Sequence, residues 1–236
     1  MAKSSGPLSG SIPSASTMGR RIVPSGIPSL DKIIEGGFNE GDTVLIAGQP
    51  GVGKSTFGAQ FVYFGAEQYG QVGILASFVE SASKLKRDML RFNWDFAAAE
   101  KDSKVLVLDL LQTVGRKGVD VGLEILMAAV NSMGAKRLVI DSLSALMTYI
   151  DTKAEARSFM GAMNKLLENA GCTSLFILEV PWGDKTIGLG FEEFMTDGLV
   201  VLESSLEKFK VRRKLFVPKM RGLNHSLDCF DFFITP

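Results

Sequence analysis

Residues 48–55 read Gly48-Gln-Pro-Gly-Val-Gly-Lys-Ser55, and this stretch decides the fold. It matches the pattern G-x-x-x-x-G-K-[ST], in which glycines let backbone N–H groups converge on an anion. The run upstream, residues 43–47, is apolar and typical of a strand, and three phenylalanines recur downstream at helical spacing. A strand, a glycine loop and a helix in this order direct the positive end of the helix dipole at bound phosphates. The alternative is a glycine-rich turn that joins two core elements.

Two side chains of the loop carry specific chemistry. Lys54 supplies positive charge for the β- and γ-phosphates of a nucleotide, and Ser55 offers its hydroxyl to Mg²⁺. These residues therefore predict a nucleoside triphosphate and Mg²⁺ as cofactors. The predicted nucleotide-binding residues of the loop are Gly48, Gln49, Pro50, Gly51, Val52, Gly53, Lys54, Ser55 and Thr56.

Size and composition set limits on the other functions. The chain has 236 residues, 46% of them hydrophobic, which suits one domain with a sizeable core. Its formal net charge is zero, so the overall balance favours neither nucleic acid nor an anionic membrane. We find no apolar stretch near 18 residues and expect no membrane span. The two cysteines have no metal-ligand spacing, and we expect them to be buried, reduced thiols of a cytoplasmic protein.

The first 19 residues differ from the rest of the chain. They consist mainly of Ser, Gly, Pro and Ala, which cannot bury enough apolar surface to offset the entropy of ordering. We therefore expect a disordered tail over residues 1–19 and an ATPase domain over residues 20–236. Met18 is an alternative start of the chain.

Strand-like and helix-like segments alternate through most of the domain. The expected strands are residues 44–47, 73–78, 105–110, 137–141 and 174–180, and the expected helices are residues 29–35, 54–69, 81–92, 119–133 and 155–169. Three further strand-like runs, residues 199–202, 214–219 and 230–234, follow with polar turns between them. This pattern predicts an α/β fold whose mostly parallel sheet has helices on both faces and an antiparallel extension at its C-terminal side.

Two acidic residues follow predicted strands. Asp141 ends the run Arg137-Leu-Val-Ile-Asp141, and the carboxyl edge of a parallel sheet is where ligands bind, so we expect it to hold Mg²⁺. Glu80 lies just beyond another strand, where a carboxylate can orient and activate the attacking water. The structural alternatives are a cap of the next helix for Asp141 and a first-turn acid that interacts with the helix dipole for Glu80.

Taken together with the loop, these residues resemble the KaiC-like branch of the RecA superfamily of ATPases. The resemblance runs from about Val23 to Ile234. It is carried by short motifs in a fixed order: Pro24-Ser-Gly-Ile-Pro-Ser-Leu-Asp31, Gly36-Gly37, the glycine loop, Phe78-Val-Glu-Ser81, Phe92-Asn-Trp-Asp95, Val139-Ile-Asp-Ser142, Phe191-Glu-Glu-Phe194 with Asp197-Gly198, Val217-Pro-Lys-Met-Arg-Gly222 and His225.

The resemblance implies ATP bound at subunit boundaries, usually in a homo-oligomeric, hexameric ring. It implies that Lys219 and Arg221 reach the nucleotide of a neighbouring subunit, with His225 near the same ATP. Such cations neutralise charge on the transferring phosphoryl group. Without the resemblance, Lys219 and Arg221 are alternate outward residues of an edge strand.

One departure from the family pattern bears on activity. The family has two adjacent glutamates after the second strand, whereas this chain has Val79 and Glu80. We expect weak ATP hydrolysis that depends on Glu80. A non-hydrolysing, ATP-dependent switch is the first alternative, and a RadA-like DNA-binding relative is the second. Residues 181–190, with Trp182, and the basic residues 208–214 are the candidate nucleic-acid segments.

Overall fold

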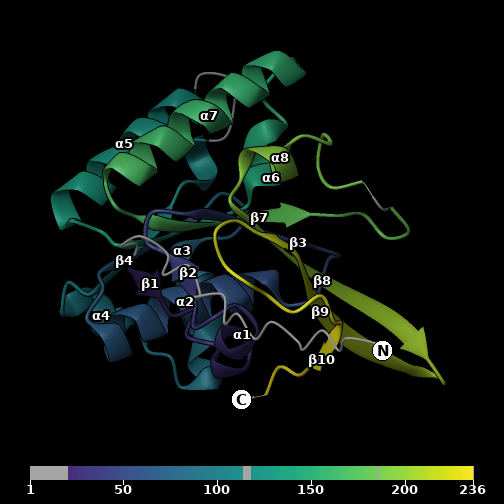
Figure 1. Cartoon of the computed structure of the whole chain (residues 1–236). Coiled ribbons are helices and arrows are strands. Elements are labelled where there is room, and N and C mark those ends of the chain that lie inside the picture. Colours follow the sequence, from purple (N-terminus) through teal and green to yellow (C-terminus); the bar gives the residue numbers. More distant parts are fainter. Residues whose placement is uncertain (1–20, 114–117, 185, 236) are drawn as a thin grey trace, which may run out of the picture.

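The computed structural model describes residues 21–113, 118–184 and 186–235 (Figure 1). The predicted disordered tail lies outside these described residues. Among them, eight strands form one sheet in the order β10-β9-β8-β3-β7-β6-β4-β5. The strands are β3 (Thr43–Gly48), β4 (Gly73–Ser77), β5 (Val105–Asp109), β6 (Arg137–Asp141), β7 (Thr173–Glu179), β8 (Gly198–Glu207), β9 (Lys210–Met220) and β10 (Phe230–Phe232).

The sheet is parallel from β8 to β5, and β9 and β10 extend it antiparallel. The inner strands are buried along their length because helices cover both faces, which explains why β3 and β6 read as continuous apolar runs. The predicted fold class is confirmed. A separate two-stranded sheet of β1 (Ile22–Val23) and β2 (Phe38–Asn39) was not predicted.

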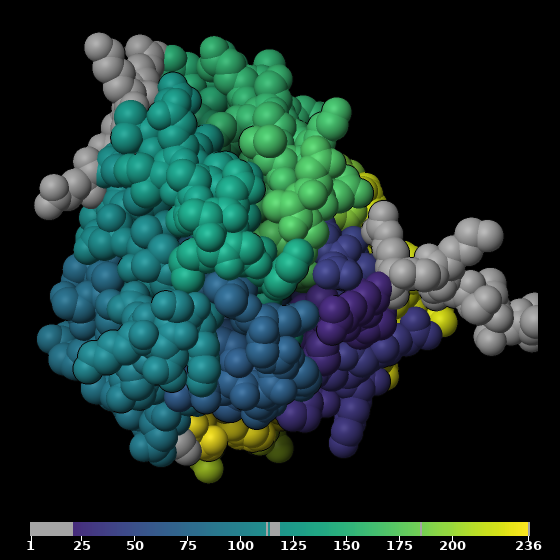
Figure 2. All heavy atoms as spheres, turned by 90° about the vertical axis from the view of Figure 1, so that its left-hand side faces the viewer, coloured from purple at the N-terminus to yellow at the C-terminus, as the bar shows by residue number. Residues whose placement is uncertain are grey.

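The helices lie in two layers (Figure 1). One layer holds α1 (Pro28–Ile33), α2 (Lys54–Tyr69), α3 (Ala82–Met89) and α4 (Phe96–Lys101); the other holds α5 (Gly118–Met133), α6 (Leu143–Met147), α7 (Lys153–Asn169) and α8 (Glu192–Met195). Two short 3₁₀ turns, η1 (Leu90–Phe92) and η2 (Leu111–Thr113), complete the described elements. Figure 2 shows the side of the molecule away from the β8–β9 hairpin, where the atoms of the two helical layers together form a continuous surface.

Local signals explain most helix boundaries. The helix α2 begins after Gly53 and ends before Gly70, both with positive φ, and matches the predicted bounds. Ser81 caps α3 as predicted, accepting the Lys84 N–H at 3.4 Å. Three short helices, α4, α6 and α8, were missed because four to six residues show no helical periodicity.

The hairpin between β8 and β9 is longer than predicted. A two-residue turn, Lys208 and Phe209, joins the strands, and both residues have positive φ (47° and 64°). This turn geometry suits the twist of a hairpin but usually uses Asn and Gly, so Lys208 and Phe209 carry no recognisable turn signal. The ring of Phe209 is 99% exposed at the tip.

The two cysteines differ in burial. Cys172 is buried as expected, and burial raises the pKa of its thiol to about 12. Cys229 is exposed, so the expectation of a buried thiol is wrong there. Cys229 precedes β10, a three-residue strand paired on one side in the described structure, and that position offers little cover.

Arg137, at the start of β6, is fully buried beneath α2. Its guanidinium donates to Gln71 Oε1 at 2.7 Å and to the Phe61 carbonyl at 2.8 Å, and it lies over the Phe61 ring. Burial lowers the pKa of Arg137 to about 10. A Cβ at Gly65 would come within 2.2 Å of the arginine side chain, so α2 and β6 pack around this group.

We predict that Arg137→Ala lowers the free energy of unfolding by about 3 kcal/mol, because it leaves a cavity and unpaired polar groups under α2. Urea denaturation measures the change. Lys165→Ala, at an exposed position of α7, is the control and should stay within about 0.5 kcal/mol of wild type. Equal stability of the two variants would show that Arg137 is not a packing centre.

Candidate active site

The residues expected to bind a nucleotide lie at the carboxyl edge of the parallel sheet. Gly48 ends β3, Asp141 ends β6, and the loop between β3 and α2 crosses the same edge. On β6, Val139 belongs to the core on the α2 side and Ile140 to the core on the other side. Because side chains alternate along a strand, Asp141 lies on the α2 side, facing the start of that helix.

The loop needs glycine at two positions for different reasons. A Cβ at Gly48 would lie 2.2 Å from the Leu202 carbonyl oxygen, because β8 passes directly beside the loop. Gly53 has φ +112°, and a Cβ there would lie 2.3 Å from Ile234 Cδ1. The side chain of Gln49 fixes the loop to the hairpin, since its Oε1 accepts hydrogen bonds from the Ser204 N–H and hydroxyl, both at 2.9 Å.

Lys54 is 7% exposed and curls back into the loop. Its Nζ donates to the carbonyls of Gly48 and Gln49, both at 2.9 Å. Burial lowers the pKa of Lys54, and the charges of Glu179 and Asp141 act against this shift. The ammonium is therefore held at the loop by backbone oxygens, with two carboxylates nearby.

Asp141 is 9% exposed, and burial raises the pKa of its carboxyl group. A hydrogen bond from Ser55 and the charge of Lys54 oppose the shift, while the charges of Glu179 and Glu80 add to it. Ser142 caps α6, accepting the Ala145 N–H at 3.3 Å, so the alternative of Asp141 as the cap is wrong.

The donor set around Asp141 fits Mg²⁺. A carboxylate and the Ser55 hydroxyl are hard oxygen ligands, and Mg²⁺ usually takes one or two carboxylates with phosphates and waters. In the part of the chain that the structure describes, no group of three or more acidic, His or Cys side chains could hold a metal alone. Phosphate oxygens of a nucleotide and waters would complete the coordination of a magnesium ion here.

Glu80 lies just after β4, as predicted, and one oxygen of its carboxylate is engaged in an ion pair. It accepts from Lys84 Nζ at 2.6 Å, one turn along α3, and its side chain is 41% exposed. The Glu80 N–H donates to Ser77 Oγ at 3.0 Å. The neighbouring Val79 is 46% exposed and leaves the position of the second family glutamate without a charge.

Glu179, the last residue of β7, was missed by the sequence analysis. It lies opposite Gly48 in the β3–β7 register. The signal was available, since Glu179 ends an apolar strand just as Asp141 does.

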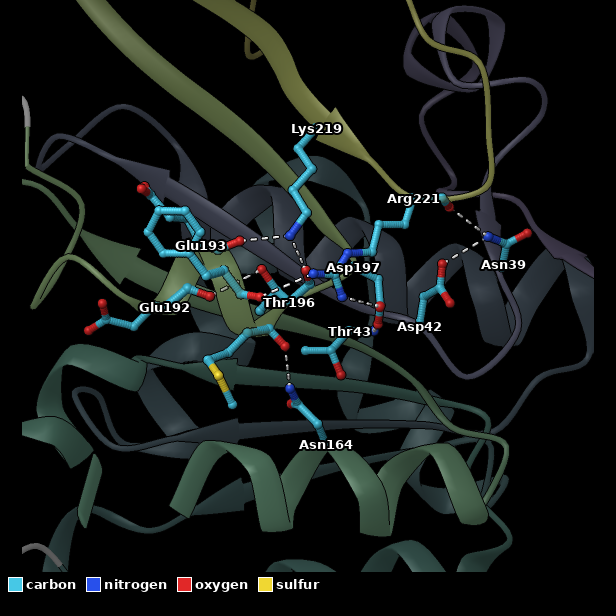
Figure 3. A network of polar contacts seen from close by, with 12 residues as sticks. Asn39, Asp42, Thr43, Asn164, Glu192, Glu193, Thr196, Asp197, Lys219 and Arg221 are labelled. Atoms are coloured by element: carbon cyan, nitrogen blue, oxygen red, sulfur yellow. Dashed lines mark hydrogen bonds and ion pairs between the residues drawn. The ribbon is translucent and has the colours of Figure 1, made fainter. Parts of the chain in front are cut away.

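Lys219 and Arg221 contact α8 and the residues that follow it (Figure 3). Lys219 Nζ donates to the carbonyls of Glu193, at 2.8 Å, and Thr196. Arg221 donates to the Phe194 carbonyl at 3.2 Å and pairs with Asp197 at 3.5 Å. Burial lowers the pKa of Lys219, and the nearby Arg221 lowers it further.

These contacts satisfy carbonyls at the end of a four-residue helix that has too few internal hydrogen bonds to stand alone. The simple alternative of outward-pointing charges on an edge strand therefore does not describe Lys219 and Arg221. Both residues also line a cavity of about 610 Å³ with an apolar floor that includes Val201 and Phe216.

His225 lies in a segment that runs along α1. The Ser226 N–H donates to the Ile33 carbonyl at 3.0 Å, and the Asn224 N–H donates to Glu35 at 2.9 Å. The Nε2 atom of His225 is buried without a hydrogen-bond partner among the described residues. The structure does not bring His225 together with Lys54 or Asp141 through any contact in its described part.

An apolar cleft of about 660 Å³ opens beside the loop. Gly53 and Thr56 line it on the loop side. Most of its other walls are aromatic or aliphatic, among them Phe57, Phe64, Trp94, Phe230, Phe232 and Ile234. Its size and lining suit a flat aromatic ligand next to the phosphate-binding loop.

The candidate nucleic-acid segments are only partly suited to that role. In the hairpin, Arg212 pairs with Asp231 at 2.9 Å, and Lys214 pairs with Glu207 at 2.5 Å, so acids offset two of its five cations. Trp182 is 64% exposed and available for stacking. Binding of single-stranded DNA stays a prediction, which a salt-dependent titration would test.

The strand, glycine loop and helix, with an acid across the cleft, define a P-loop nucleotide-binding protein of the RecA type. Comparison with known proteins identifies the family within this class. The sequence profile of the ATPase family described as KaiC matches residues 23–236. The chain therefore belongs to the KaiC family of ATPases.

Curated relatives and a solved structure agree with this assignment. The chain is 36% identical over 226 residues to a UPF0273 protein of Thermotoga maritima (90% of this chain, 92% of the relative). It is 32% identical over 226 residues to one of Methanocaldococcus jannaschii (90% and 93%). A crystal structure of a KaiC-like protein from Pyrococcus horikoshii superposes with a TM-score of 0.82 at 38% identity, covering 92% of this chain and 96% of that one.

In the described residues, no helix has both the length and the apolar character needed to cross a membrane.

We predict that Asp141→Asn stabilises the nucleotide-free protein at neutral pH. Burial raises the pKa of Asp141, so the folded state binds a proton more tightly than the unfolded state, and ionised Asp141 costs stability above that pKa. The advantage of the variant should shrink as the pH falls and wild-type Asp141 becomes protonated. Urea denaturation at pH 7.5 and at pH values approaching 4 measures the difference; an advantage that grows on acidification would contradict the prediction.

Proposed function

We propose that the protein hydrolyses ATP in a Mg²⁺-dependent reaction. The observation that carries the proposal is the arrangement of Lys54 at the glycine loop with Asp141 and Ser55 hydrogen-bonded beside it. Lys54 and the loop N–H groups would bind the phosphates. Ser55 and Asp141 would hold Mg²⁺, which would screen the phosphate charge. A carboxylate at the same edge would activate water, the role that the sequence predicts for Glu80.

The adenine ring would bind in the aromatic cleft beside the loop. The cleft borders Gly53 and Thr56, so a base there can connect to phosphates held by the loop. Stacking on an aromatic wall favours a flat base without selecting one by hydrogen bonds. The preference for adenine is an inference from membership of the ATPase family.

We further propose that ATP lies at a boundary between subunits of a homo-oligomeric ring, six in number by analogy with the family. Lys219, Arg221 and His225 would then act on the neighbour's nucleotide. One observation supports this: in the described structure, neither Lys219 nor Arg221 forms a hydrogen bond or ion pair with its own glycine loop, although Gly48 and Gln49 line the same cavity.

An ATP-dependent switch without hydrolysis is the second candidate. One observation favours it: the carboxylate of Glu80 forms an ion pair with Lys84, and the neighbouring residue is the uncharged Val79. Phosphate release by wild-type protein separates the two functions. Tight ATP binding with no release would favour the switch.

We predict that Lys54→Ala reduces ATP affinity by roughly two orders of magnitude or more, because it removes charge-assisted hydrogen bonds to the phosphates. Calorimetric titration with ATP·Mg²⁺ measures the loss. Lys165→Ala, on the exposed side of α7, is the control and should bind normally. Normal binding by Lys54→Ala would exclude the loop as the phosphate site.

We predict that Arg221→Ala lowers turnover by up to about a thousandfold while leaving ATP binding largely unchanged, as expected of a finger supplied by a neighbour. Phosphate release gives turnover, and light scattering after size separation, with and without ATP·Mg²⁺, gives assembly. Arg87→Ala, at an exposed site on α3, is the control. Normal turnover in an assembled Arg221→Ala protein would show that the assignment in trans is wrong.

A further inference from the structure

Glu179 is fixed at the centre of the carboxyl edge, between the glycine loop and Asp141. Its strand, β7, pairs with β3 on one side and β6 on the other, and Glu179 lies opposite Gly48. Its N–H donates to Ser144 Oγ at 2.9 Å, and the next N–H, of Val180, donates to the Gly48 carbonyl at 2.9 Å. The backbone that carries this carboxylate is therefore tied to the loop and to α6.

The alternation of β7 sets the direction of the Glu179 side chain. Leu175 and Ile177 belong to the core on the α2 side, whereas Leu178 and Val180 belong to the core on the opposite side. Glu179 therefore lies on the α2 side, the same side of the sheet as Asp141, facing the start of the helix that follows the loop. This is the side on which a bound triphosphate would lie.

The carboxylate of Glu179 is exposed and available. In residues 21–113, 118–184 and 186–235, no hydrogen bond or ion pair engages its side-chain oxygens. Glu80, by contrast, shares its Oε1 atom with Lys84 Nζ at 2.6 Å. Of the two acids, Glu179 is the one whose two carboxylate oxygens are both unengaged among the described residues.

The charge of Glu179 already acts on the site. Its effect on the pKa of Lys54 exceeds that of Asp141, and it also raises the pKa of Asp141. Both effects agree with the position inferred from the strand register, close to the ammonium and to the proposed metal ligand.

We propose that Glu179 is a catalytic residue that orients the attacking water and takes its proton, an inference that rests on the proposed ATPase function. The water oxygen bonds to the γ-phosphorus as the bond from that phosphorus to the β,γ-bridging oxygen breaks. The bridging oxygen leaves with ADP and its electron pair. One water proton passes to Glu179, which returns it to bulk water, and the other stays on the released phosphate.

The test compares Glu179→Gln with Glu80→Gln, with the exposed Glu124→Gln on α5 as a matched control. Phosphate release gives turnover, and calorimetry with a non-hydrolysable ATP analogue and Mg²⁺ gives binding. Glu179→Gln should lower turnover by roughly a hundredfold, the loss expected for a general base. The same variant should bind the analogue about threefold to tenfold more tightly, because a negative charge beside the phosphates is gone.

Slower turnover with tighter binding is a pattern that loss of structure does not produce. If Glu179→Gln turns over within about twofold of wild type, or if it loses affinity for the analogue, the role of Glu179 is wrong while the ATPase function stands. If wild-type protein binds the analogue but releases no phosphate from ATP, the ATPase proposal and the role of Glu179 are both overturned.

Discussion

The site depends on the close pairing of β3 with β7 and β8. This pairing brings the first glycine of the loop between two neighbouring backbones, with Leu202 on one side and Glu179 on the other. Any side chain at Gly48 would push β8 away, and with it the hairpin to which Gln49 is bonded. Since parallel strands finish at one edge, the same pairing places the carboxylates of β6 and β7 beside the loop. The pairing of the strands in the sheet thus sets the positions of the loop and of the carboxylates beside it.

The charged groups at the carboxyl edge of the sheet are subject to two opposing effects, burial and mutual attraction. Lys54 and Asp141 are both nearly excluded from water, and burial disfavours the charged form of each. Each is stabilised by the other and by hydrogen bonds from its surroundings, and Glu179 adds a second negative charge. A site with two carboxylates and one ammonium has a net negative charge, which favours binding of a divalent cation. That imbalance costs stability in the empty protein. It would favour a bound cation, whereas the charge of Glu179 would weaken the binding of phosphates, a compromise common at catalytic sites.

The sequence was sufficient for the sheet, the loop and Asp141, because long apolar runs and a spaced glycine motif are local signals. It failed where structure depends on distant partners. The helix α8 forms because Lys219 and Arg221, more than 20 positions further on, satisfy its carbonyls. The pairing of Glu80 with Lys84, in contrast, is local: the two residues are spaced i,i+4, as in common ion pairs on helices, and the sequence reasoning did not consider this partner. Glu179 was within reach of the same reasoning that found Asp141 and was overlooked.

The contacts of Lys219 and Arg221 with α8 carry a consequence for self-association. In the proposed ring, Lys219 and Arg221 would bind a neighbour's nucleotide and give up their hydrogen bonds to the carbonyls of α8. Loss of a hydrogen bond to a charged group costs about 1.5–3 kcal/mol. Each bond that is not replaced weakens association by roughly tenfold or more. Dilute subunits would therefore remain dispersed until a triphosphate offers these side chains an equivalent partner, which gives assembly a concentration threshold set by the nucleotide.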